Sequence, residues 1–319
     1  MNEMFYLEFE RPIYEIEKEI AELKKLAKDN LNLWSEVREL EEKATKLREK
    51  IYSNLSRYQK VQIARHPDRP HSSDYIKMIF SDFMEIHGDR AFGDDPSIIT
   101  GFATIDSFKV ILIGQEKGKT TQEKIRRNFG MPHPEGYRKA MRVMRLADKF
   151  GLPIVTLVDT PGAYPGVGAE ERGQAQAIAE SIRTMLQVSV PIIVVIIGEG
   201  GSGGALAIAV GNRVLALEHS IYSVISPEGC ASILWRDASK AKEAAEALKL
   251  TAQDLYEFGI VDEIIPEPLG GAHWEPQQTA ENLKKSLIEN LKRYESFDRE
   301  QVLKERREKF RKFGVIMGE

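Results

Sequence analysis

Hydrophobic residues in the first 60 positions recur at alternating spacings of three and four, the pattern of an amphipathic helix. The pattern breaks at Asp29–Asn32 and then resumes, so residues 12–60 are expected to form a helical hairpin with one apolar stripe on each arm. Charged residues between the stripes suit a solvated helix face. We assign residues 1–60 to an N-terminal hairpin with a structural or assembly role.

The helical pattern ends within residues 64–74, where two prolines mark a domain boundary. Beyond it the period changes to that of strands. Two strands are predicted on either side of Asp106-Ser107, which is expected to be the turn of a β-hairpin. A helix is predicted from Pro134 to Phe150, stopped at Gly151.

An internal repeat follows, because residues 152–168 and 190–206 share one plan: a proline, a short apolar strand, a glycine-rich loop and a helix. Both strands lack the alternation of a half-exposed sheet and are expected to be covered on both faces, as in layered α/β proteins. A further strand is predicted at 213–219. We assign residues 61–280 to the main domain and residues 281–319 to a charged tail, expected to be a solvated or packing helix.

Composition narrows the class of protein. The 319 residues are 42% hydrophobic with a net charge of −4, so no global charge favours nucleic acid or an anionic membrane as partner. The single cysteine, Cys230, excludes an internal disulfide and a Cys-rich zinc ribbon, and fits a reducing compartment.

We find no secretory signal or membrane-length apolar stretch and expect a cytoplasmic protein. We predict no metal site, since His66 and His71 lack ligand spacing and no Cys/His cluster occurs.

The richest candidate site is the glycine loop 198–204, between a buried strand and a helix, where backbone N–H groups and the helix dipole can stabilise an oxyanion. Its glycines at 198, 200 and 203 also fit a dinucleotide-binding fingerprint, with Glu218 as the ribose-binding acid. Against this, only about nine residues remain for the helix before Arg213, whereas a parallel crossover usually needs more.

The same loop fits a nucleophile elbow, which leaves a ClpP-like serine hydrolase as the alternative function. Ser202 would then be the nucleophile, with Asp254 or Asp262 and His273 following in the required order. A third alternative is that both glycine loops only allow close packing of helix on strand.

A guanine-nucleotide site is a weaker alternative. Residues 159–162 resemble a GTPase switch and residues 114–120 a phosphate loop. The phosphate loop needs four residues between its glycines and this one has three, and no guanine-binding motif follows. Asp159 is therefore better explained as a turn or capping carboxylate than as a magnesium ligand.

Long unbroken motifs carry a resemblance to a known family. They are residues 123–140, 159–174, 197–208, 222–235 and 265–273. With them the chain closely resembles, nearly end to end, the carboxyltransferase alpha-subunit family of the multi-subunit acetyl-CoA carboxylases of bacteria and plastids. The resemblance implies an α/β fold of the crotonase or ClpP-like type, a spiral of repeated β-β-α units. It also implies transfer of the carboxyl group of carboxybiotin, borne by a carrier protein, to acetyl-CoA. The product is malonyl-CoA, formed in the first committed step of fatty acid biosynthesis.

The resemblance further implies partners. A beta subunit of the same fold would carry the zinc ribbon in an alpha2beta2 heterotetramer, and biotin carboxylase and the biotin carboxyl carrier protein would complete the system. This chain itself is then expected to bind no cofactor, with acetyl-CoA and carboxybiotin as substrates. The lone Cys230 is consistent with zinc on the partner.

By resemblance, the backbone amides of Gly203 and Gly204, with Ala205 close by, form an oxyanion hole, expected on the biotin side of the reaction. An added Cβ at Gly204 is expected to meet the substrate. The wall of the substrate and biotin site is expected to include Thr160, Gly162, Ala163, Tyr164, Gly166, Gly200 and Gly201. The cationic residues expected either to contact the phosphates of CoA or to be solvated include Lys124, Arg126 and Arg127.

Overall fold

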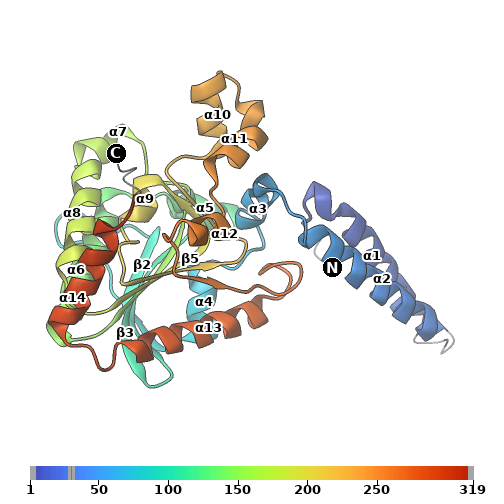
Figure 1. The fold of residues 1–319 in the computed structure, drawn as a ribbon, viewed down its shortest axis with the longest axis horizontal. Helices are drawn as coiled ribbons and strands as arrows, with labels where there is room; N and C mark the ends of the chain where they lie inside the picture. Colours follow the sequence, from blue (N-terminus) through green and yellow to red (C-terminus); the bar gives the residue numbers. More distant parts are fainter. Residues whose placement is uncertain (1–4, 28–29, 31–32, 315–319) are drawn as a thin grey trace, which may run out of the picture.

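The computed structural model describes residues 5–27, 30 and 33–314. Within them a mixed sheet of eight strands has the order β1-β2-β3-β4-β5-β6-β8, with β7 attached to β5. The sheet runs through the body with helices around it (Figure 1). Strands β1, β2 and β3 pair antiparallel, and the remaining pairs are parallel. The strands are β1 (Ser81–Glu85), β2 (Ile98–Ile105), β3 (Phe108–Gln115), β4 (Ile154–Thr160), β5 (Ile192–Gly201), β6 (Arg213–Leu217), β7 (Ile221–Ser223) and β8 (Glu263–Ile265).

Strand β5 changes partner along its length, which shapes the site described below. Its first part pairs with β6, from Ile193 to Ile196, and its last three residues, from Glu199 to Gly201, pair with β7. The β4–β5 ladder is irregular at the same level, between Val158 and Thr160. The carboxyl ends of β4 and β5 stay paired beyond this irregularity, at Thr160 and Gly200, where the two glycine loops begin.

Helices cover both faces of the sheet, which explains why its central strands show no alternation. One face packs against α6 and α8 through a core that includes Tyr137, Val143 and Met185. The other packs against α4 and α13, with Tyr75 and Leu287 in its core. The helices of this body are α3 (Arg57–Ala64), α4 (Ser72–Ile79), α5 (Thr121–Arg126), α6 (Pro134–Phe150), α7 (Val167–Glu171), α8 (Gln174–Gln187), α9 (Ser202–Leu206), α10 (Pro227–Trp235), α11 (Ala241–Leu248), α12 (Ala252–Glu257), α13 (Pro276–Arg293) and α14 (Arg299–Arg311), with 3-10 turns at Asn128–Gly130 and Ala238–Lys240.

Two local predictions are confirmed. Strands β2 and β3 form a hairpin in which Ile105 pairs with Phe108, and Asp106 turns the chain at a φ of 52°. Asp tolerates this left-handed region better than most residues. Helix α6 has the predicted bounds, and Gly151 caps it at a φ of 68°.

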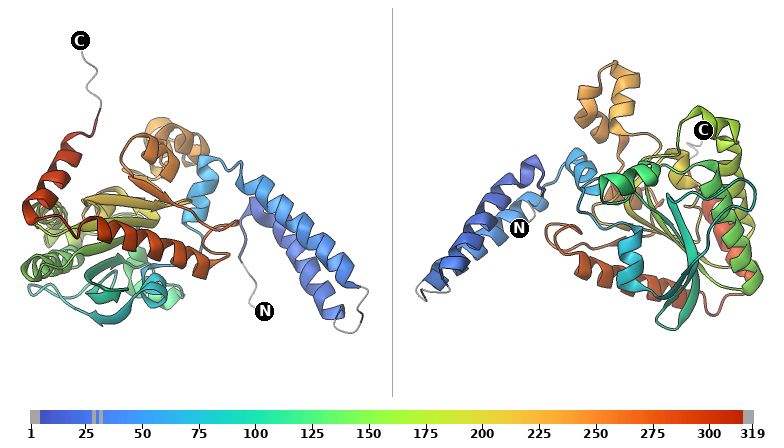
Figure 2. Two further views of the ribbon diagram at one scale, coloured as in Figure 1. Left: turned by 60° about the horizontal axis from the view of Figure 1, so that its bottom comes forward. Right: turned by 180° about the vertical axis from the view of Figure 1, so that it is seen from behind.

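The N-terminal hairpin projects from the body as two long helices, α1 (Arg11–Leu26) and α2 (Trp34–Tyr52), preceded by a 3-10 turn at Glu8–Glu10 (Figures 1 and 2). Its arms pack on each other along the predicted apolar stripes, and the buried residues include Ile20, Val37 and Ala44. The predicted break at Asp29–Asn32 lies almost entirely outside the described residues. No described helix is both long and apolar enough to cross a membrane.

The charged segment beyond residue 280 packs against the body. Helix α14 buries the guanidinium of Arg306, which donates hydrogen bonds to the carbonyls of Met185, Val188 and Val190 and to Asn212 Oδ1. The Met185 and Val188 carbonyls lie at the end of α8 and the Val190 carbonyl just beyond it, where no further helical turn supplies N–H donors, so the arginine satisfies them. Burial lowers the pKa of Arg306 to about 10. The domain boundaries that we placed at residues 60 and 280 from the sequence stay a prediction.

Candidate active site

The two glycine loops touch backbone to backbone, and this contact requires glycine. A Cβ built on Gly201 would lie 2.2 Å from the Pro161 carbonyl oxygen, and one on Gly204 would lie 2.4 Å from the Ala163 amide nitrogen. Both distances are far below any real Cβ contact. The expectation that a side chain at Gly204 would meet the substrate is therefore wrong: it would meet the loop after β4.

Gly203 is different, because a side chain there would meet only ordinary van der Waals contacts. Its Cβ would have Ile178 Cγ2, at 3.6 Å, as nearest neighbour. Helix α9 begins at Ser202, so the amides of its first turn have no acceptor within the helix, and no described side chain caps them. These amides suit a ligand oxyanion.

A cleft of about 900 Å³ opens beside this turn. Its lining includes Ser202, Gly203 and Leu206 of α9 and Tyr222 of β7. The aromatic rings of Phe258 and Phe310 also line it. The cleft is mostly apolar, so a charge that develops near the α9 amides would have little competing water.

Side chains hold the loop after β4 in place. The Thr160 hydroxyl lies 2.6 Å from the Gly130 carbonyl oxygen and accepts from the Gly162 amide at 3.1 Å. The Tyr164 ring stacks on His133 at 4.2 Å between centroids, and the Tyr164 amide donates to the Pro132 carbonyl. The loop predicted as the wall of the site is thus a fixed surface.

The remaining predicted wall residues are packed within the loops. A Cβ on Gly200 would lie 2.8 Å from Tyr222 Cδ2, and one on Gly166 would lie 2.4 Å from Tyr164 Cε1. Ala205 is fully buried in the core beneath the site. Ala163 is half-buried and contacts α9 through its amide.

Beneath the loops lies a buried charge network that the sequence did not predict. The Asp159 carboxylate contacts Lys117 Nζ at 2.7 Å and His71 Nδ1 at 3.0 Å, and it accepts from the Glu199 amide at 3.0 Å. Arg65 then pairs with the Glu199 carboxylate at 2.7 Å. Burial alone would raise the pKa of Asp159, but Lys117 and His71 outweigh it and hold the pKa well below its ordinary value. Asp159 is therefore an ionised structural anchor.

The proposed serine triad is not assembled. Ser202 is exposed at a φ of 53°, a strained conformation that suits an elbow. However, His273 Nε2 contacts Glu10, Asp254 pairs with Arg57, and Asp262 accepts from the Val214 amide. No hydrogen bond joins Ser202 to any of these groups in the described residues, so the sequence order of a triad was misleading.

The predicted cationic residues divide into two groups. Arg127 donates to the Pro96 carbonyl at 2.6 Å and is tied to the body. Lys124 and Arg126 lie on α5, and Arg126 is exposed. Lys117, from the same basic stretch, points inward to Asp159. Contact of Lys124, Arg126 and Arg127 with CoA phosphates stays a prediction.

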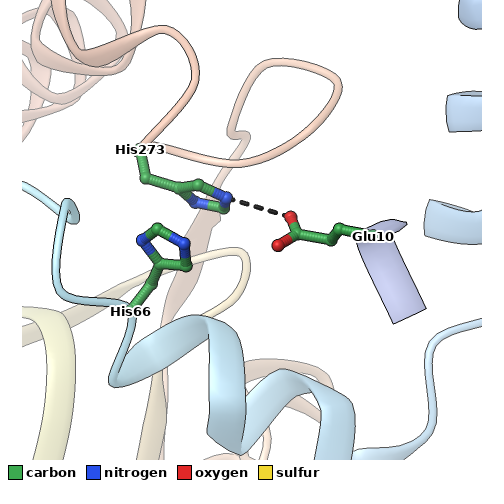
Figure 3. A group of neighbouring side chains, drawn as sticks. All are labelled: Glu10, His66 and His273. Carbon is green, nitrogen blue, oxygen red and sulfur yellow. Dashed lines mark hydrogen bonds and ion pairs between the residues drawn. The ribbon is translucent and has the colours of Figure 1, made fainter. Parts of the chain in front are cut away.

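A second polar cluster joins the hairpin to the body, formed by Glu10, His66 and His273 (Figure 3). One ligand-type atom from each lies within 4.8 Å of the others, although sequence spacing predicted no such group. The imidazole rings stack at 3.9 Å, so their in-plane lone pairs do not converge on one ion. His66 Nδ1 accepts from the Asp68 amide. The arrangement fits a hydrogen-bonded contact between the hairpin and the body better than a metal site.

Protonation supports that interpretation. Burial would raise the pKa of Glu10, but hydrogen bonds from His273, from Tyr52 and from the Leu7 amide hold it at about 2. Burial lowers the pKa of His66 to about 4. At neutral pH the cluster is therefore one carboxylate surrounded by hydrogen-bond donors, beside an uncharged His66.

Residues 6–314 match the family described as acetyl co-enzyme A carboxylase carboxyltransferase-like. The chain belongs to this family. The carboxyltransferase chain is 59% identical over 312 residues to the acetyl-coenzyme A carboxylase carboxyl transferase subunit alpha of Geobacter metallireducens, with 98% of each chain covered. It is 56% identical to the corresponding subunit of Thermus thermophilus, over 97% of this chain and 98% of that relative.

Solved structures share the fold of this carboxyltransferase chain. Transcarboxylase 12S has a TM-score of 0.56 and 22% identity, over 69% of this chain and 41% of its own. The beta subunit of a geranyl-CoA carboxylase from P. aeruginosa has a TM-score of 0.56 and 16% identity, over 79% of this chain and 45% of its own. The predicted crotonase-like α/β fold is confirmed, and the hydrolase alternative finds no support.

Proposed function

We propose that this chain supplies one of the two oxyanion sites of an acetyl-CoA carboxylase carboxyltransferase, through the first-turn amides of α9. The observation that carries the proposal is the geometry at Gly203, whose amide lies at an uncapped helix start beside an apolar cleft of about 900 Å³. The family to which the chain belongs indicates the reaction, which is carboxyl transfer to acetyl-CoA.

The chemistry creates two negative oxygens. Carboxybiotin releases CO2 and leaves negative charge on the ureido oxygen of biotin. The biotin anion then takes a proton from the methyl group of the acetyl thioester, and the resulting enolate attacks CO2 to give malonyl-CoA. Preorganised amides can stabilise such an oxygen by a few kcal/mol without a charged side chain. This chain's share is the α9 turn, and we assign it to the ureido oxygen.

The second oxyanion site would come from a beta subunit of the same fold, with two copies of each chain in the assembly. The biotin carboxyl carrier protein would deliver carboxybiotin made by biotin carboxylase, and any zinc would reside on the beta subunit. Lys124 and Arg126 on α5, with Arg127 at its end, would contact the phosphates of CoA. This chain would bind no cofactor of its own and would act in the cytoplasm.

The test is reconstitution. The purified chain alone is expected to show no carboxyl transfer between malonyl-CoA and biotin, because only one oxyanion site is present. Addition of the purified beta subunit should produce transfer. Transfer by the single chain, or an inactive complex that has assembled by gel filtration, would contradict the proposal.

Ser202→Ala is expected to keep at least about half of the turnover of the reconstituted enzyme, since the hydroxyl is given no chemical role. The amide is retained, and alanine removes only an exposed oxygen. Turnover and melting temperature are measured on the same complex. A loss of more than about 10³-fold with an unchanged melt would restore the nucleophile hypothesis.

A further inference from the structure

Gln115 lies between the two glycine loops and contacts both. It is the last residue of β3 and is fully buried. Its side-chain Oε1 accepts from the Asp159 amide at 3.1 Å, and its Nε2 donates to the Gly204 carbonyl oxygen at 2.8 Å. One amide group thus joins the end of β4 to helix α9.

Both main-chain groups depend on this contact. The β3–β4 ladder ends at the Gly114–Leu157 pair, so the Asp159 amide lies beyond the last strand partner on that side. The Gly204 carbonyl lies in the short helix α9, and the amides of the following turn donate elsewhere, those of Ala207 to Gly203 and of Ile208 to Ala205. Without Gln115 these buried groups would lose a direct hydrogen-bond partner.

The hydroxyl of Tyr137 reaches the same Gly204 carbonyl, at the longer distance of 3.4 Å. Tyr137 is fully buried, and burial raises the pKa of its hydroxyl well above the ordinary value, so the group stays a proton donor. Two side chains therefore converge on one carbonyl of α9, and the shorter contact is that of Gln115.

The carbonyl of Gly204 and the amide of Ala205 belong to one peptide group, and the preceding peptide carries the Gly204 amide. Hydrogen bonds to a carbonyl polarise its peptide and hold its plane in a fixed orientation. An oxyanion donor acts through its orientation, because a preorganised dipole needs no rearrangement as charge develops. The contact between Gln115 and α9 therefore acts directly on the turn that carries the oxyanion donors.

We infer that Gln115 is a positioning residue for the oxyanion site: its side chain fixes the α9 turn against β4 and polarises the peptide beside the donors. The inference rests on the proposed role of α9. Gln115 touches no substrate in this arrangement and acts only through the backbone.

The variant Gln115→Glu separates donor from acceptor. The introduced carboxyl group has the same shape and can still accept from the Asp159 amide, but when ionised it cannot donate to Gly204. In the reconstituted complex at pH 8, kcat is expected to fall about 10- to 100-fold with little change in KM, as for lost transition-state stabilisation.

Protonation should restore the missing donor. A carboxyl group buried at this position should have a raised pKa, and its protonated form offers an O–H in the place of Nε2–H. The ratio of variant to wild-type kcat is therefore expected to rise as pH falls from 8 to 6. Asp159, Lys117 and His71 are present in both proteins, so their effect on kcat as pH changes cancels in this ratio. A role in stability alone predicts a lower melting temperature of the variant with a wild-type kcat at pH 8.

Gln253→Glu is the matched control. Gln253 likewise accepts one hydrogen bond, in its case from the Lys60 side chain, and donates one to a carbonyl, that of Glu218 at 3.0 Å, but it lies outside the glycine loops. Its kcat should stay within about twofold of wild type at every pH.

Tyr137→Phe provides a second variant that introduces no charge, should Gln115→Glu fail to fold. Loss of the longer hydrogen bond is expected to lower kcat about 2- to 10-fold with an unchanged KM. An inactive wild-type complex would refute the proposed function. When the wild-type complex is active, the inference alone would be refuted if Gln115→Glu kept its kcat at pH 8 or if the ratio of its kcat to that of wild type did not vary with pH. If Gln115→Glu does not fold, full kcat in Tyr137→Phe would refute it.

Discussion

Replacing Gly204 by valine is expected to lower turnover of the reconstituted enzyme by at least about 10²-fold and to lower the melting temperature as well. The reason is steric and lies within the chain. The new Cβ would lie 2.4 Å from the Ala163 amide nitrogen and 2.5 Å from the Gly162 carbonyl carbon, so the two loops must separate. Backbone atoms cannot move aside as a flexible side chain would, and the α9 donors would move with the loop.

Gly93→Val is the control for the glycine-to-valine change itself. A Cβ on Gly93 would have no neighbour within 4 Å, and the backbone there is not in the left-handed region. Its melt and turnover should match wild type. If Gly204→Val kept a normal melt but lost turnover, the clash would be with the substrate; normal turnover would place the oxyanion site elsewhere.

Replacing Asp159 by alanine is expected to destabilise the folded chain by about 3–5 kcal/mol, the usual cost of leaving a buried charge unpaired. Within the described part of the chain, Lys117 would keep only Glu199 as a carboxylate partner, at 3.5 Å, and His71 and the Glu199 amide would lose the Asp159 carboxylate as acceptor. Because the Asp159 carboxylate accepts from the Glu199 amide in the second glycine loop, that loop should loosen. Denaturant unfolding of wild type and variant measures the free-energy difference.

Two comparisons make that measurement specific. Glu41→Ala removes an exposed ion pair with Lys24, 2.7 Å long, and should change stability by less than about 1 kcal/mol. The double variant Asp159→Leu with Lys117→Met removes both buried charges and should recover part of the loss. A single variant as stable as Glu41→Ala would mean that the network contributes little.

Local sequence determined most of the fold. The hairpin turn at Asp106, the glycine cap at Gly151 and the tandem strand–loop–helix repeat all appear where short-range patterns predict them. Such features depend on the conformational preferences of a few neighbouring residues and on a hydrophobic period. The glycine loops were recognisable for the same reason, since only glycine permits so close an approach.

Tertiary structure decided which atoms lie against those glycines. Sequence alone placed a substrate against Gly204, whereas the neighbour is the backbone of another loop. It also suggested a triad from Ser202 and His273, whereas the fold pairs His273 with Glu10. Residue order carries no distance, so groups that must meet in space cannot be identified from it.

The sequence by itself determined the family, the layered α/β architecture and the position of the glycine loops, because these follow from local pattern and from long unbroken motifs. Only the tertiary structure decided the side chains that hold the site: Gln115 reaches Gly204 across 89 positions, and Asp159 meets His71 across 88. It likewise buried Arg306 of the charged C-terminal segment against the end of α8. The physical reason is that a buried polar group must find its partner wherever the folded chain presents one, and the partner need not be near in sequence.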